Sequence, residues 1–245
     1  MKKLITICAV LCLVAIGTSQ AALIPLGTTA ANFAVLGGSS VTNSGSNTIL
    51  NGFLGVSPGS TVTGFPPGTY TGGIIHLNDA VAQLARSEVT ATYNSLTTLT
   101  GTQDLTGHVL GSAGYQTLTA GVYDFTAAAQ LTGTLTLSGP GDFVFRIGSS
   151  FGTSSNAEVL VTNGADAGNV YWQVGSSVAL NTGTAFKGNI LTNSSIVLND
   201  GTLDGRALAG SSVTIIGETI TTIPEPTTIC LLGLGALSLI RRKKS

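Results

Sequence analysis

The chain has 245 residues, of which 43% are hydrophobic and only 9% are charged, and its formal net charge is −1 at pH 7. Six of its ten Lys and Arg residues lie within the first three or the last five residues, so the body between the two ends is acidic. An acidic body lacks the positively charged surface that phosphate groups require, which excludes nucleic acid as a partner. The three cysteines, Cys8, Cys12 and Cys230, also lie near the ends, so the body has no disulfide and no thiol nucleophile.

The N-terminus is typical of a secretory signal peptide. It begins with Met1-Lys2-Lys3, continues with an apolar run over residues 4–16, and reaches small residues at Ala21-Ala22. A positive start, a short apolar core and a small-residue exit are the three parts of such a signal. The apolar run is shorter than a membrane-spanning helix needs, so we predict that residues 1–22 are removed. The alternative is an uncleaved N-terminal anchor.

Residues 23–223 are predicted to form one β-rich domain. This stretch is rich in Gly, Ser and Thr, yet apolar side chains recur in it at regular intervals, which argues against disorder. Near its start, the run Gly64-Phe65-Pro66-Pro67-Gly68 predicts a rigid turn, because each proline fixes its own φ angle. We interpret this turn as a cap over one open end of the fold, since uncovered sheet edges invite aggregation.

One substantial helix is predicted, at about residues 79–98. No Gly or Pro interrupts this stretch, and Asn78 or Asp79 can accept hydrogen bonds from its first backbone amides. We expect the apolar stripe of the helix to lie against one side of the domain, with Arg86 and Glu88 on the outer face. The stripe consists of Val81, Ala85, Val89, Tyr93 and Leu96.

The second half of the body predicts short strands arranged in repeated coils. Apolar residues alternate with others over residues 143–147 and 170–174, which is the period of strands with one buried face. Three similar segments, at 176–181, 194–199 and 211–216, align at intervals of 18 and 17 residues. Repeats of this kind indicate stacked coils, each of which buries an apolar side against the next. A coil of this length fits three short strands and three turns, so we predict a β-solenoid of roughly triangular section.

The C-terminus has three parts in a fixed order. Pro224-Glu225-Pro226 is followed by an apolar segment over residues 227–240 and by a basic cluster over residues 241–244. Basic residues after an apolar segment stay on the cytoplasmic side, which places the body across the membrane. These parts resemble the PEP-CTERM sorting signal of Gram-negative bacteria. The resemblance implies recognition by an exosortase, removal of the tail, and delivery to the cell surface or to extracellular polysaccharide. The alternative is a tail anchor that uses the same transmembrane helix without cleavage.

Eight stretches spread through the body carry a second resemblance. They run in order and cover nearly the whole body, at residues 26–36, 55–59, 63–65, 118–123, 143–148, 170–175, 188–191 and 204–208. With these stretches the body resembles the microbial ice-binding (antifreeze) protein family. The resemblance implies a mostly β fold, namely a right-handed discontinuous β-solenoid with one α-helix packed alongside.

The resemblance also implies a binding surface, a flat solenoid face lined with short Thr, Ser and Ala side chains. Strands stack about 4.7–4.9 Å apart and outward residues recur two positions apart, which makes a rigid array of small hydroxyl and methyl groups able to order water. The apolar residues at 178, 180, 196, 198, 213 and 215 are predicted to point inward. The outward candidates are then Ser40, Thr42, Ser150, Ser177, Ala179, Ser195, Val197, Ser212 and Thr214. The alternative is that these residues merely cover a solvated strand surface.

Residues suited to catalysis or metal binding are few in the body. The two histidines are His76 and His108, and only Asp79 stands near His76, whereas zinc sites need three or four ligands. Asp200 and Asp204 lie in separate predicted turns and lack the further ligands of a calcium loop. We therefore expect no metal, no cofactor and no enzyme activity.

The leading interpretation is an exported ice-binding protein that adsorbs to ice or ordered water and inhibits ice growth or recrystallisation. It is expected at the cell surface or outside the cell, with the membrane as a transient partner through the C-terminal tail alone. The alternative is a structural or adhesive component of the extracellular polysaccharide matrix. The sorting tail favours this alternative, and so does the proposed face, where Ser, Val and Ala replace much of the Thr that the family resemblance implies. A carbohydrate-active enzyme is a more distant alternative.

Overall fold

The computed structural model describes residues 26–223. The predicted signal peptide and the predicted sorting tail with its transmembrane segment, at residues 1–22 and 224–245, lie outside the described residues. Among residues 26–223, no helix is both long enough and apolar enough to cross a membrane. Both hydrophobic clusters of the described chain are built from these residues, so the domain carries its own core.

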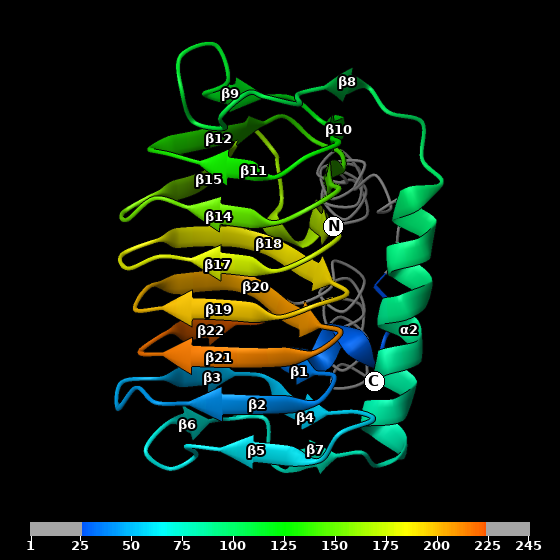
Figure 1. The fold of residues 1–245 in the computed structure, drawn as a ribbon, viewed down its shortest axis with the longest axis vertical. Helices are drawn as coiled ribbons and strands as arrows, with labels where there is room; N and C mark the ends of the chain where they lie inside the picture. The colour runs from blue at the N-terminus through cyan, green and yellow to red at the C-terminus, as the bar shows by residue number, and fades with distance from the viewer. Residues whose placement is uncertain (1–25, 224–245) are drawn as a thin grey trace, which may run out of the picture. The chain divides into compact units, whose positions relative to one another are not determined.

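The domain is a three-sided solenoid in which every strand pair between described residues is parallel (Figure 1). One side is a separate seven-stranded sheet, here called the seven-stranded side. In spatial order it contains β11 (Ala129–Leu131), β14 (Phe151–Thr153), β17 (Val178–Leu180), β19 (Ile196–Asn199), β21 (Ser212–Ile216), β2 (Ser40–Asn43) and β5 (Thr61–Thr63).

The other two sides share one larger sheet, because two long strands divide between them. The first residues of β18 (Ala185–Thr192) and β20 (Thr202–Ala209) pair on one side and their last residues pair on the other. The division falls at Gly188 and Gly205, whose φ angles of 114° and 154° favour glycine. The third side, as we call it, also contains β9 (Thr117–Leu118), β12 (Thr134–Ser138), β15 (Glu158–Thr162), β22 (Thr219–Thr221), β3 (Ile49–Asn51) and β6 (Thr69–Tyr70).

The remaining side, the helix side, is covered by α2 (Ala80–Thr97), which runs along the stack (Figure 1). The helix begins where predicted, since the Asp79 side chain accepts a hydrogen bond from the Ala82 amide at 2.9 Å. Its buried stripe packs in a cluster with Tyr171, Leu191 and Leu208 of the helix side. Besides the last residues of β18 and β20, this side contains β8 (Gln103–Asp104), β10 (Gly121–Phe125), β13 (Phe143–Ile147), β16 (Val170–Val174), β1 (Phe33–Gly37), β4 (Phe53–Val56) and β7 (Ile75–Leu77).

The prediction that Arg86 and Glu88 lie on the outer face of the helix is wrong. Both side chains flank the buried stripe and reach backbone groups of the solenoid. Arg86 donates to the Ala209 carbonyl at 2.6 Å, and burial lowers the pKa of its guanidinium to about 10. The Glu88 carboxylate accepts from the amides of Thr29 and Ala30 at 3.0 and 2.7 Å. Two charged side chains therefore hold the helix to the domain.

The solenoid is discontinuous, as expected. The chain forms β1 to β7 at one end of the stack, passes along the helix, and starts again with β8 at the opposite end (Figure 1). The later coils then descend until β20, β21 and β22 pair with β1, β2 and β3. The first and last parts of the domain are thus joined in one continuous stack. The right-handedness of the coil stays a prediction.

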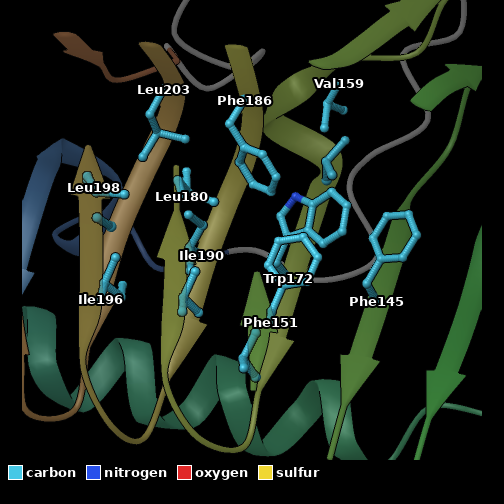
Figure 2. Packing of buried hydrophobic residues seen from close by; sticks show 14 of the residues in the cluster. Phe145, Phe151, Val159, Trp172, Leu180, Phe186, Ile190, Ile196, Leu198 and Leu203 are labelled. Atoms are coloured by element: carbon cyan, nitrogen blue, oxygen red, sulfur yellow. The ribbon is translucent and has the colours of Figure 1, made fainter. Parts of the chain in front are cut away.

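A group of contacting aromatic rings lies in the core (Figure 2). Phe145 and Trp172 lie almost parallel, with ring centroids 4.0 Å apart and planes 9° apart. Phe151 and Phe186 contact the same indole, with centroids at 5.1 and 4.8 Å. The indole nitrogen is satisfied as well, since it donates to the Lys187 carbonyl at 3.0 Å. Trp172 therefore connects four strands of two neighbouring coils through apolar contact.

Replacing this side chain should leave the largest cavity that a single substitution can create here. We expect Trp172→Ala to lower the free energy of unfolding by about 3–5 kcal/mol, the usual cost of removing a buried aromatic side chain. Chemical denaturation of residues 23–223 measures this change. A loss below about 1 kcal/mol would contradict the packing described above.

One buried carboxyl group lacks a complete set of partners. Glu218 lies between β21 and β22 and is only 1% exposed. Its Oε2 accepts from the Gly201 amide at 2.8 Å, whereas Oε1 has no hydrogen-bond partner among residues 26–223. Burial, with a smaller contribution from the charge of Asp200, raises the pKa of Glu218 to about 7.

This raised pKa makes stability depend on pH. The folded carboxyl keeps its proton up to about pH 7, whereas an ordinary glutamate loses it near 4.5, so the folded state binds more protons in between. The contribution of Glu218 to stability should be greatest below pH 4.5 and should fall by roughly 3 kcal/mol as the pH rises to about 7. Glu218→Gln should remove this loss, so the variant gains on wild type as pH rises. If the free energies of unfolding of the two proteins changed by the same amount between pH 4 and 8, the assignment to Glu218 would be wrong.

Candidate functional site

The seven-stranded side presents two outward columns of small side chains. The inward residues of its strands, such as Val178, Val213 and Val41, are completely buried, which forces the residues between them outward. Hydrogen-bonded register aligns the outward residues from strand to strand without a shift. The first column contains Ser212, Ser40 and Thr61 together with Ser150, Ser177 and Ser195, which immediately precede β14, β17 and β19. The second column contains Gln130, Gly152, Ala179, Val197, Thr214, Thr42 and Thr63.

The structure brings together all nine residues that the sequence predicts for this face. Each of them lies in one of the two columns, with Ser40 opposite Ser212 and Thr42 opposite Thr214. Sequence reasoning missed four column members, namely Gln130, Gly152, Thr61 and Thr63. The Thr61-Val62-Thr63 alternation was the available signal, since it repeats Ser40-Val41-Thr42 twenty-one residues later. The sorting-motif residues Pro224, Glu225 and Pro226 lie outside the described residues.

The two columns change in composition along the stack. On β21, β2 and β5, both outward positions carry a hydroxyl group, which gives three rows of Ser or Thr. On β14, β17 and β19, the second column instead carries Gly152, Ala179 and Val197. The hydroxyl-rich half of the side therefore lies at the end formed by the N-terminal coils.

The hydroxyl groups of the second column are free to bind water. Those of Thr42, Thr63 and Thr214 form no hydrogen bond with any other residue in 26–223. Some threonines of the third side are paired instead, since the Thr221 hydroxyl accepts from Asn51 at 3.1 Å and the Thr134 hydroxyl donates to Glu158 at 3.5 Å. Unpaired hydroxyl groups at fixed spacing can each hold a water molecule in a set position.

Charge also separates the seven-stranded side from the rest of the surface. Its strands contain no Asp, Glu, Lys or Arg. The third side carries Glu158 and an ion pair between Lys187 and Asp204, and α2 covers the helix side. An uncharged lattice of small groups, open along seven strands, occurs only on the seven-stranded side of the described domain.

A groove with both polar and apolar lining residues lies between the second half of α2 and the helix side, with a volume of about 650 Å³. Within it, Arg146 binds both carboxylate oxygens of Asp124 at 2.6 and 2.8 Å. Hydrogen bonds from Thr106 keep the pKa of Asp104, the other acid of the groove, below its ordinary value. Sugar hydrolysis needs one acid in its protonated form, and the lowered pKa makes Asp104 unsuited to that role.

The other candidates for chemistry have structural roles. His76 is buried and contacts Asp79 at 2.8 Å, so the pair belongs to the start of α2. Hydrogen bonds from the Ala82 amide and from His76 lower the pKa of Asp79. No group of three or more potential metal ligands occurs among residues 26–223.

Two family models match the sequence. The model described as "Ice-binding-like" matches residues 35–221, and the model described as "PEP-CTERM protein-sorting motif" matches residues 222–244. Among curated proteins, an "Ice-binding protein" of Nostoc sp. (strain HG1) is 46% identical over 241 residues, covering 91% of this chain and 87% of the relative.

Solved structures give the same result. An ice-binding protein from the Antarctic ascomycete Antarctomyces psychrotrophicus is similar with a TM-score of 0.77 and 34% identity, covering 82% of this chain and 98% of that one. An ice-binding protein from an Antarctic biological consortium follows with a TM-score of 0.73 and 38% identity, covering 81% and 90% of the two chains.

Proposed function

Because this chain belongs to the Ice-binding-like family, we propose that it is an exported protein that adsorbs to ice through its seven-stranded side. The observation that carries the proposal is the pair of aligned, uncharged columns whose threonine hydroxyls have no partner among the described residues. The sites proposed are the nine residues predicted from the sequence together with Gln130, Gly152, Thr61 and Thr63.

Adsorption of this kind needs order rather than chemistry. Strand spacing of about 4.7–4.9 Å in one direction, and the two-residue repeat in the other, fix the distances between hydroxyl and methyl groups. Waters held at these positions form a layer that can join a growing ice lattice, and the bound protein then blocks further growth. The protein acts in this proposal as a surface binder and not as an enzyme, and it needs no cofactor or metal.

The proposed route places the domain outside the inner membrane. The sorting motif supports export, recognition by an exosortase and release from a transient C-terminal anchor. We assign residues 1–22 to the signal peptide, 23–223 to the ice-binding domain and 224–245 to the sorting tail. A surface or extracellular location brings the seven-stranded side into contact with external ice.

Bulky side chains on the proposed face should abolish ice binding. In Ser195→Tyr and Thr214→Tyr, a ring stands above the plane of small groups and keeps the neighbouring columns from the ice surface. We expect both variants of residues 23–223 to lose most of their thermal hysteresis and their inhibition of ice recrystallisation, with unchanged circular dichroism.

The matched control is Thr202→Tyr, which places the same ring at an exposed threonine of the third side. This control should keep full activity. A well-folded wild-type domain without activity would overturn the proposed function and leave a structural role in the polysaccharide matrix as the better explanation. Equal losses in all three variants would place the binding surface elsewhere.

Extending the threonine column should increase activity. Val197, Ala179 and Gly152 continue the column that begins with Thr63, Thr42 and Thr214. A Cβ added at Gly152 would meet nothing closer than 3.9 Å, so the longer side chain fits. We expect Gly152→Thr/Ala179→Thr/Val197→Thr to raise thermal hysteresis at equal protein concentration and to leave the melting temperature nearly unchanged. Unchanged or lower hysteresis in the folded variant would show that threonine in this column does not govern binding.

A further inference from the structure

The two ends of the solenoid differ in how well they cover the core. At one end, the segment between β8 and β9 closes the stack, with Leu105 and Leu110 completely or almost completely buried. Leu110 also forms a bridge to Leu131 of β11. At the other end, here called the open end, β5, β6 and β7 each pair with a single strand, namely β2, β3 and β4. No described segment covers the free edges of these three strands (Figure 1). The turn at residues 64–68, predicted as a cap, instead joins β5 to β6 within this last coil, with Phe65 packed against the core.

Apolar residues that should face the core are exposed at the open end. Leu77 lies in register with Val56, yet Leu77 is 46% exposed while Val56 is completely buried. Ile75 is likewise only partly buried, although its register partner Leu54 is inaccessible to solvent. The neighbouring Ile74 is 66% exposed. The last coil lacks the apolar cover that each earlier coil receives from the next.

The open end also lacks the charges that usually protect an exposed sheet edge. Residues 26–78 contain no Asp, Glu, Lys or Arg. Monomeric proteins commonly place such charges on edge strands, because free backbone N–H and C=O groups pair readily with another chain. The nearest acid along the chain, Asp79, accepts a hydrogen bond from the Ala82 amide and contacts His76 at 2.8 Å, so it belongs to the start of α2 rather than to these strand edges.

We propose that the open end is a docking surface for the open end of a second copy of this chain. Its three strand edges lie on three sides of one section, and an identical end offers three edges in the same arrangement. A two-fold axis perpendicular to the seven-stranded side would place β5 antiparallel to β5 of the second copy, which is strand addition at an edge. Strands of two or three residues pair weakly by themselves. Most of the free energy of association therefore comes from burial of the exposed apolar residues that lie between the strand edges.

The closed end limits the assembly to two copies. Its core is covered by the segment between β8 and β9, so an open end cannot continue the stack there. Pairing of like ends is therefore isologous and closed, and it yields dimers rather than fibres. This proposal concerns the solenoid end alone and does not rest on the proposed function.

Sedimentation velocity over a range of concentrations tests the proposal on residues 23–223, without the terminal segments. The wild-type domain should shift from monomer to dimer as concentration rises. Leu77→Lys places a charge at the end of the core in both copies, and it should raise the dimer dissociation constant by about tenfold or more. The control is Ile49→Lys, at a 42% exposed residue that points outward from the third side, and it should leave dimerisation unchanged.

Two results would overturn the proposal: a wild-type domain that stays monomeric at all concentrations, or a dimer that Leu77→Lys does not weaken. If circular dichroism shows that Leu77→Lys is unfolded, Ile74→Lys takes its place, because this more exposed side chain contributes less to the core. A dimer that survives Ile74→Lys as well would assign the association to another surface.

Discussion

The whole domain depends on parallel strands that stack in register from coil to coil. Backbone hydrogen bonds fix the distance between coils, and the completely buried residues Val178, Ile196 and Val213 fix which side chains point inward. The same two constraints determine the outer surface, because residues that alternate with a buried column must form an exposed column. The core and the proposed ice-binding face are thus two consequences of one register. A shift by a single residue would bury the hydroxyl groups and expose the core.

The stack is built from two separate parts of the chain, and a few polar side chains join them. Arg206 is almost completely buried and donates to the Ala31 carbonyl, to Asn189 and to the Ile223 carbonyl at 2.7–2.8 Å. It therefore connects the short segment before β1 with the last described residue. Arg86 and Glu88 attach the helix in the same way, through backbone groups. A buried charge is costly unless its hydrogen bonds are complete, so these contacts also specify how the parts fit together.

Local pattern was sufficient for the parts of the fold that repeat. The segments at 176–216 showed both the coil length and the inward residues, and Asp79 marked the start of the helix. The discontinuity could not be derived from spacing, because β2 and β21 pair across more than 160 residues. Thr61 and Thr63 were missed for this reason: their alternation repeats Ser40-Val41-Thr42, but only the placement of the N-terminal coils on the stack shows that they continue the two columns. Arg86 and Glu88 were misplaced for a related reason, because their partners lie in distant segments.

The hydroxyl-rich half of the seven-stranded side and the open end lie at the same end of the solenoid. The last row of the hydroxyl-rich half consists of Thr61 and Thr63 on β5, which is one of the strands with a free edge. In the proposed two-fold pairing, the hydroxyl-rich halves of both copies would meet at β5 and form one continuous surface. Ice contact grows with the area of matched surface, so joining the two halves would strengthen adsorption more than two separate domains could. The Ala and Val positions would then lie at the outer ends of the surface, where a loss of order has the least effect.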